Sequence, residues 1–160
     1  DVETEDKRKL SSHFSSLIHC MSFTNCGKFL ICAGDSSEVV VFDVEASTAS
    51  DDPVCTITTQ AVPKSLHCRS SNKVMIDIII GYDDCNGCLA RVHTDNEYEV
   101  EISEISTKSE ILAGSFAESF DSVIVVCGSI AKPKFHRVVF LDAEGELIQE
   151  LTTIKKAVLV

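Results

Sequence analysis

The clearest candidates for chemistry in this sequence are two cysteines separated by two residues. Cys85 and Cys88 form the pattern C-x-x-C, which occurs in zinc sites and in redox-active dithiols. A structural zinc site needs a second pair of ligands, and the adjacent His67 and Cys68 would point to opposite faces of a strand. The redox pattern usually begins a helix, whereas this pair falls at the tip of an expected hairpin. We therefore predict two free thiols in a turn, without a metal.

The other side chains that could catalyse a reaction are not arranged for it. The five histidines are scattered, and no Gly-x-Ser-x-Gly turn or Ser-His-acid set is recognisable. Asp83 and Asp84 are adjacent in a turn, whereas a catalytic pair of carboxylates must face each other across a substrate. No Gly-rich phosphate loop occurs either. The sequence predicts no catalytic residue, no cofactor and no enzymatic activity.

One short segment is basic in a chain that is otherwise acidic. Lys132, Lys134, His136 and Arg137 cluster around Phe135, and these four are the candidate contacts to RNA or to a partner. The same charges would also suit a solvated hairpin whose edge must not pair with another strand. Asp and Glu number 25 against 14 Lys and Arg, and the net charge of −11 repels a bare phosphate backbone. We therefore expect any contact with RNA to be indirect.

The composition is that of one folded domain. The chain has 160 residues, of which 44% are hydrophobic, so it can bury a substantial core. No apolar run reaches the roughly 18 residues of a membrane span, and the charged start contains no apolar signal segment. Most of the eight cysteines lie in apolar strand-like runs, where a thiol acts as a small hydrophobe, so we expect reduced thiols. The chain starts without Met and stops in an apolar run, and we expect it to be a piece of a longer protein.

Three apolar runs in the sequence end in glycines at a constant interval. Gly34, Gly81 and Gly128 are 47 residues apart, and each run is flanked by further β-rich segments, so four strands recur three times. This period is typical of β-propeller blades, although short strands at regular spacing also build β-sandwiches. We predict an all-β chain, a partial β-propeller of about three four-stranded antiparallel blades. The blades are expected at about residues 14–60, 61–104 and 105–153.

Turn signals separate the expected strands. Asn25 and Gly27 lie between the first two strands, and Gly145 lies between the last two. Asn86-Gly87 is the strongest hairpin signal, because a type I′ turn needs a positive φ at both central residues. These positions favour antiparallel hairpins over helices.

Residues 12–43 resemble a WD repeat. Ser12 and His13 stand where Gly-His is usual in such a repeat, and the later positions of the motif follow at the expected spacing. The matching positions are Ile18, Met21, Phe23, Gly27, Gly34, Val39, Val41, Phe42 and Asp43. The resemblance implies a WD-repeat β-propeller.

The chain departs from the WD repeat in lacking tryptophan altogether. In the family this ring packs between blades at the end of the third strand, where the present chain has Phe42 and Phe140. Phenylalanine can fill that place by apolar burial but has no indole N–H to donate. Asp35 also lies one place early for the usual structural aspartate, so the resemblance does not carry over the family's hydrogen-bonded side-chain tetrad.

The third repeat resembles the last blade of one family of nucleolar WD-repeat proteins. Members of that family belong to the small-subunit processome, in the group that joins nascent pre-ribosomal RNA early. The similarity runs loosely from residue 11 to 142, and its clearest positions are Val126, Gly128, Ser129, Pro133, Arg137 and Val138. It implies a scaffold of ribosome assembly in the nucleolus, with other protein subunits as partners.

We therefore predict a non-enzymatic protein-interaction scaffold that works in pre-rRNA processing, in the nucleolus or nucleus, and has no membrane partner. Two alternatives are an RNA-binding propeller module and a scaffold propeller of a coat or trafficking complex, because a fold does not fix a function. Three blades of an incomplete propeller would leave the outward faces of the first and third blades uncovered. We therefore also expect self-association through these faces.

Overall fold

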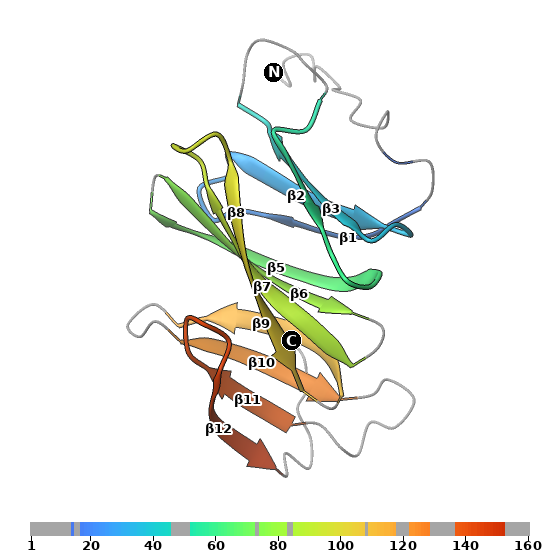
Figure 1. Cartoon of the computed structure of the whole chain (residues 1–160), viewed down its shortest axis with the longest axis vertical. Helices are drawn as coiled ribbons and strands as arrows, with labels where there is room; N and C mark the ends of the chain where they lie inside the picture. Colours follow the sequence, from blue (N-terminus) through green and yellow to red (C-terminus); the bar gives the residue numbers. More distant parts are fainter. Residues whose placement is uncertain are drawn as a thin grey trace, which may run out of the picture.

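A computed structural model of the chain describes residues 14, 17–45, 52–72, 74–82, 85–107, 109–117, 122–128 and 137–152. In this part of the chain twelve strands form three four-stranded antiparallel sheets (Figure 1), which confirms the predicted fold class. Within the same ranges no helix is long and apolar enough to cross a membrane. Several predicted positions lie outside the described residues, namely His13, Asp83, Asp84, Lys132, Lys134 and His136.

Each sheet is a meander whose strands follow the order of the chain. The first sheet contains β1 (Ile18–Phe23), β2 (Phe29–Gly34), β3 (Glu38–Asp43) and β4 (Cys55–Thr58). The second contains β5 (Pro63–Asn72), β6 (Met75–Tyr82), β7 (Asn86–His93) and β8 (Glu99–Ser106). The third contains β9 (Glu110–Phe116), β10 (Val123–Gly128), β11 (Arg137–Leu141) and β12 (Leu147–Thr152). The first strands of the sheets are neighbours, β1 beside β5 and β5 beside β9, as expected for blades arranged around one axis.

Two of the three expected turns occur where the sequence indicated them. Gly27 has a φ of 76° in the turn between β1 and β2, and its N–H donates to the carbonyl of Thr24 at 2.8 Å. Gly145 has a φ of 87° between β11 and β12, and its N–H donates to the carbonyl of Asp142. Glycine adopts this left-handed conformation without a Cβ penalty, which explains its presence at both positions.

The prediction of a turn at Asn86-Gly87 was wrong. Both residues belong to β7, and the residue with positive φ before this strand is Cys85, at 70°. Gly87 is paired with Gly81 of β6. A Cβ on Gly87 would lie 2.6 Å from Cδ1 of Ile111 in β9, and one on Gly81 would lie 2.8 Å from Cβ of the same residue. This glycine pair therefore allows the third sheet to approach the second, rather than forming a turn.

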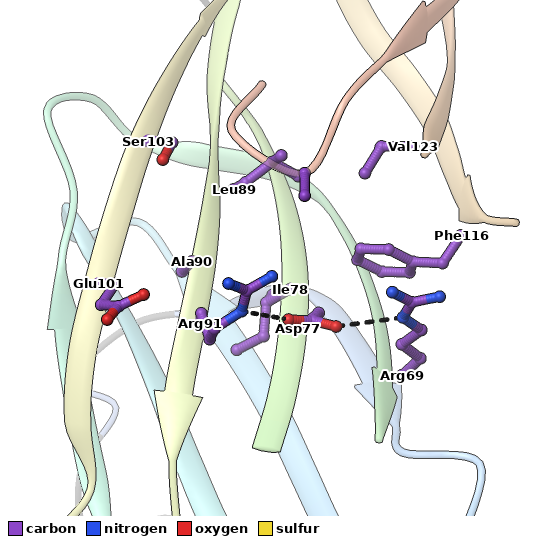
Figure 2. Close-up of a pocket in the computed structure, with 11 residues that line it drawn as sticks. Arg69, Asp77, Ile78, Leu89, Ala90, Arg91, Glu101, Ser103, Phe116 and Val123 are labelled. Carbon is purple, nitrogen blue, oxygen red and sulfur yellow. Dashed lines mark hydrogen bonds and ion pairs between the residues drawn. The ribbon is translucent and has the colours of Figure 1, made fainter. Parts of the chain in front are cut away.

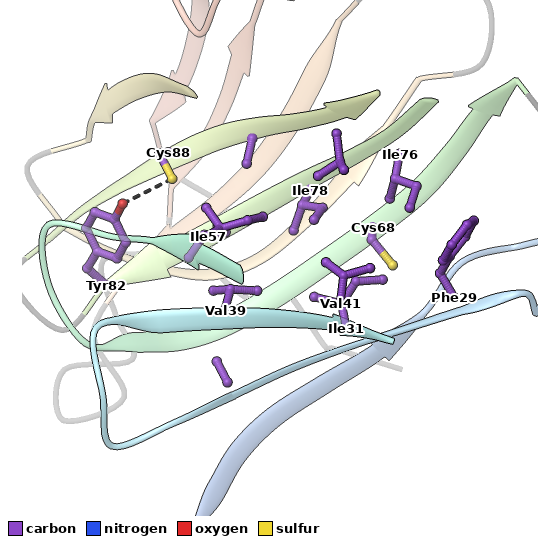
Figure 3. Close-up of a cluster of buried hydrophobic side chains, with 14 residues drawn as sticks. Phe29, Ile31, Val39, Val41, Ile57, Cys68, Ile76, Ile78, Tyr82 and Cys88 are labelled. Carbon is purple, nitrogen blue, oxygen red and sulfur yellow. Dashed lines mark hydrogen bonds between the residues drawn. The ribbon is translucent and has the colours of Figure 1, made fainter. Parts of the chain in front are cut away.

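The first hydrophobic core lies between the first and second sheets (Figure 3). Ile31 and Val41 face it from the first sheet, while Ile76 and Ile78 face it from the second, all with at most 1% of their surface exposed. Burying a side chain of this size stabilises the fold by about 1.5–3 kcal/mol relative to leaving it exposed. Because isoleucine and valine are branched at Cβ, they suit the pleated surfaces that meet here.

The second core lies between the second and third sheets. Ile79 and Leu89 of the second sheet meet Ile111, Val125 and Val139 of the third, and all five are buried. The alternation along β6 supports both cores at once, because Ile78 faces the first sheet and Ile79 faces the third. The middle sheet thus packs apolar side chains on both faces.

The 47-residue recurrence does not place equivalent residues on equivalent faces in the first and second sheets. Ile31 points from the first sheet toward the second, whereas Ile78, which is 47 residues later, points back toward the first. Val125, a further 47 residues on, also points to the preceding sheet. A shift of one residue turns every side chain of a strand to the other face. The first sheet is therefore one residue out of phase with the other two.

Phe42 and Phe140, which the sequence led us to expect between blades, lie on the two faces that point away from the middle sheet. Phe42 points away from the second sheet and is buried with Cys32 and Val40, against which Phe14 packs. Phe140 is paired with residues of β10 and β12 on the face of the third sheet that points away from the second, and it is half-buried. Neither ring lies between two of the three sheets.

Candidate interaction sites

A buried carboxylate between two arginines forms a polar site in the second sheet. Asp77 of β6 lies directly across from Arg69 of β5 and from Arg91 of β7. Its two oxygens accept hydrogen bonds from Nε of Arg69 at 3.1 Å and from Nε of Arg91 at 3.0 Å (Figure 2). The Asp77 side chain is 8% exposed, and the arginine side chains are 25% and 35% exposed. A charge this deeply buried needs such partners.

The site also joins the second sheet to the third. The Arg69 guanidinium carbon lies 4.6 Å from the centre of the Phe116 ring, and Nη1 donates to the carbonyl of Ala117 at 3.2 Å. Phe116 ends β9, so one arginine is held by a carboxylate of its own sheet and by the next sheet (Figure 2). The cavity beside these groups measures about 40 Å³, enough for a water molecule but not for a substrate. The arrangement can bind charge and fix two sheets together.

A larger groove of about 290 Å³ lies between β8 and the last two strands of the third sheet. Glu104, Glu146 and Glu150 line it together with Arg137, and the apolar Leu147 is 60% exposed at the same place. Three carboxylates against one guanidinium make the groove negative. Its chemistry suits a cationic group and repels a phosphate.

Arg137 is the one described member of the basic segment that the sequence offered as an RNA or partner contact. Its Nη1 donates to Glu150 Oε1 at 3.0 Å. Its Nη2 donates to Ser109 Oγ at 2.7 Å and to the carbonyl of Thr107. The guanidinium therefore links β11 to β12 and to the connection between the second and third sheets. These bonds would have to be given up, at least in part, for contact with a phosphate.

The two cysteines of the C-x-x-C pattern have different surroundings, and the expectation of two turn thiols was wrong for one of them. Cys88 lies within β7 and is fully buried, and the Tyr82 hydroxyl donates to its sulfur at 3.0 Å (Figure 3). Burial raises the pKa of the Cys88 thiol to about 12, so it stays protonated at neutral pH. Cys85 precedes the strand and is half-buried. Among the described residues no group of His, Cys, Asp and Glu could hold a metal ion.

Most of the remaining cysteines act as apolar side chains. Burial raises the pKa of the thiols of Cys20 and Cys32 to about 11 each. Cys26 differs, because it lies in the exposed turn between β1 and β2. A hydrogen bond with the Thr24 hydroxyl, 3.3 Å away, is the main cause that lowers its pKa. Cys26 is therefore the thiol of this set best suited to react.

Sequence reasoning missed two polar contacts. Asp77 interrupts an apolar run of the sequence, and a single acid in such a strand with an arginine in each flanking strand is a readable signal. His19 of β1 interacts with Asp35, just after β2, through Nε2 and Oδ1. The β1–β2 hairpin brings this pair together. Three of the predicted repeat positions are the last residue of a strand: Gly34 of β2, Asp43 of β3 and Gly128 of β10. Gly81 is the last residue but one of β6.

Comparisons with known proteins identify the fold. No protein-family model matches the chain, and no curated protein matches its sequence. Among solved structures, the Dos1 propeller matches 89% of this chain and 37% of its own length, with a TM-score of 0.67 and 15% identity. The Cps50 (Swd1) β-propeller domain of Myceliophthora thermophila matches 88% of this chain and 42% of its own, with a TM-score of 0.61 and 16% identity.

The WD40 repeats of RRP9 match 86% of this chain and 39% of their own length, with a TM-score of 0.63 and 11% identity. The present chain thus spans about two fifths of the propellers that it matches. It has the fold of part of a WD40 β-propeller.

Proposed function

We propose that this chain is a non-enzymatic protein-interaction scaffold in the nucleolar assembly of the small ribosomal subunit. The observation that carries the proposal is the three-sheet WD40 architecture, which matches solved propellers over more than four fifths of the chain. Such sheets present loops and strand edges to several partners while their cores hold the geometry fixed. The same fold serves unrelated assemblies, so the fold supports a scaffold but not a particular complex.

The placement in ribosome assembly is supported by the sequence resemblance to nucleolar WD-repeat proteins in the third repeat. The RRP9 propeller among the matching structures agrees with this placement. The partners would be protein subunits of the assembly complex, and a negative groove between the second and third sheets favours a partner with basic side chains.

Direct RNA binding is the less favoured role for the described part. The net charge is −11, and Arg137 is bound to acceptors of its own chain. We expect pre-rRNA to be reached through protein partners.

The experiment is to express the tagged chain in its own cells and to follow it on a sucrose gradient. We expect it to sediment with pre-ribosomal particles that contain unprocessed small-subunit rRNA, and to give nucleolar fluorescence. Fractionation with vesicle coats would contradict the assignment and favour a trafficking scaffold.

A variant separates the protein-mediated role from direct RNA binding. Replacing Lys132 and Lys134 with Glu keeps the structural bonds of Arg137 and should leave sedimentation with the particles unchanged. The wild type is crosslinked to pre-rRNA with ultraviolet light as a reference. If the variant loses both these crosslinks and its association with the particles, the basic segment is an RNA contact.

A further inference from the structure

The groove between β8 and the last two strands of the third sheet lies between two neighbouring sheets. Each wall belongs to a four-stranded sheet of the chain, so the described residues are enough to form it. The buried Val139 and Leu141 of β11 are part of its lining. Leu147 of β12 also lines it, with 60% of its surface exposed. The groove therefore has an apolar side that is open to water.

The corresponding place between the first and second sheets is filled. Tyr98, just before β8, and Val100 within it pack against the first core, and the Cys55 thiol of β4 donates to the Tyr98 carbonyl at 3.8 Å. The residues 47 positions later are Gly145 and Leu147. Tyr98 and Gly145 have positive φ values of 58° and 87°, each in the turn before the last strand of its sheet. Because the second and third sheets are in the same phase, these two pairs are equivalent.

The difference between tyrosine and glycine explains why the second gap is open. The Gly145 backbone lies close to β8, since a Cβ on this residue would be 3.4 Å from Cγ1 of Ile105. Glycine supplies no side chain to fill the space beyond. Leu147 is accordingly exposed, whereas Val100 is half-buried. The opening follows from one residue of the third repeat.

Acidic side chains give the groove its charge. Among the described residues that line it, Glu104, Glu146 and Glu150 face one guanidinium, that of Arg137. Nη1 of Arg137 donates to Oε1 of Glu150 at 3.0 Å, so these two charges largely offset each other. The remaining excess is negative, and the exposed Glu146 adjoins Leu147 in the chain. A ligand complementary to this groove carries a positive charge beside an apolar surface.

The strands that border the groove favour a peptide as that ligand. β8 and β12 are the last strands of their sheets, and within the described part of the chain their outer edges pair with no strand. Backbone N–H and C=O groups on such an edge can bind an extended segment. The volume of about 290 Å³ is near the lower end of the roughly 300–1,000 Å³ of ligand sites. It therefore accommodates one or two side chains rather than a folded surface.

We propose that this groove binds an extended segment of a partner protein in which a lysine or arginine stands next to an apolar residue. The cation lies near Glu146 and the apolar side chain covers Leu147. This inference rests on the proposed scaffold function, to which it adds the chemistry of the partner.

The test is fluorescence anisotropy of the purified chain with the labelled peptide Gly-Ser-Ser-Arg-Leu-Ser-Gly-Ser. We expect a dissociation constant on the order of 100 µM, because the contact is much smaller than the roughly 800 Å² per partner of a stable interface. Two control peptides carry Glu in place of Arg, or Ser in place of Leu. Each should bind at least about 5-fold more weakly, because it lacks the charge contact or the apolar contact.

Two variants of the chain locate the binding site, and each has a neighbouring residue as its matched control. Glu146→Lys reverses a charge that lines the groove, whereas Glu144→Lys makes the same change in the same turn at a residue outside the lining. Leu147→Ser removes the apolar contact, whereas Ile148→Ser alters a side chain that is 58% exposed outside the lining.

Both groove variants should weaken peptide binding at least about 5-fold, and both controls less than about 2-fold. All four side chains are exposed, so the fold should persist, and circular dichroism checks it.

Three results would overturn the proposal. Absence of binding up to about 1 mM peptide would show that the groove does not recognise this chemistry. Equal losses in Glu146→Lys and Glu144→Lys would show that the net charge of the chain, not the groove, attracts the peptide. A dimer of the free chain that Glu146→Lys dissociates would show that a second copy fills the groove.

The scaffold role is tested separately, by sedimentation with pre-ribosomal particles. A chain that sediments with the particles but does not bind the peptide refutes only the groove. A chain that binds the peptide but does not sediment with them refutes the placement in ribosome assembly.

Discussion

Replacing Asp77 with alanine leaves two arginine side chains without the carboxylate that both of them contact. Removing one partner from a buried ion pair costs about 3–5 kcal/mol, mostly because the remaining charge stays desolvated. Arg69 and Arg91 are 25% and 35% exposed at their side chains and have contacts besides Asp77, so water and these contacts compensate part of the lost pairing. We therefore expect Asp77→Ala to lower the free energy of unfolding by about 2–3 kcal/mol.

Urea denaturation measures this loss as a lower midpoint with an unchanged slope. The matched control is Glu101→Ala, because Glu101 lines the same cavity but its side chain is 62% exposed. This control should change the free energy of unfolding by less than about 1 kcal/mol. A second comparison identifies the cause: the triple change Asp77→Leu, Arg69→Met, Arg91→Met removes all three charges and should recover most of the loss.

If Asp77→Ala lowers the free energy of unfolding no more than the Glu101→Ala control does, the contacts of Asp77 with the two arginines do not stabilise the fold. The reasoning also fails if the triple variant is less stable than Asp77→Ala. In that case shape rather than unpaired charge would govern the site.

Two further predictions follow from the glycines and the thiols. Gly87→Ala should cost about 3 kcal/mol in urea denaturation, because the new Cβ would lie 2.4 Å from the Ile80 carbonyl oxygen and 2.6 Å from Ile111 Cδ1. Gly27→Ala, which would contact nothing within 4 Å, should cost only the left-handed strain of about 1–2 kcal/mol, and equal losses would contradict the steric account. Iodoacetamide at neutral pH should alkylate Cys26 well before Cys88. Hydrogen bonding to a threonine hydroxyl lowers the pKa of Cys26, whereas burial raises the pKa of Cys88 to about 12. Peptide mass spectrometry checks this order, and earlier labelling of Cys88 would show that β7 opens readily.

The strands could be predicted from the sequence because each carries its own evidence. Alternation, β-branched residues and turn glycines are local properties, so the pattern located all three sheets. The face of the sheet on which each side chain lies could not be predicted in the same way. Ile31 and Ile78 are equivalent in the 47-residue repeat but point in opposite senses relative to the order of the sheets. The difference of one residue arises in strand pairing, which a recurrence of glycines does not report.

The contacts between sheets were also beyond the sequence pattern. Gly87 has the local sequence of a hairpin turn, but its lack of a side chain leaves room for Ile111, which is 24 residues away in the chain. Likewise the arginines that hold Asp77 are identified only when the registers of β5, β6 and β7 are known. Tertiary packing decided both cases, because a turn propensity is weaker than the gain from close sheet packing.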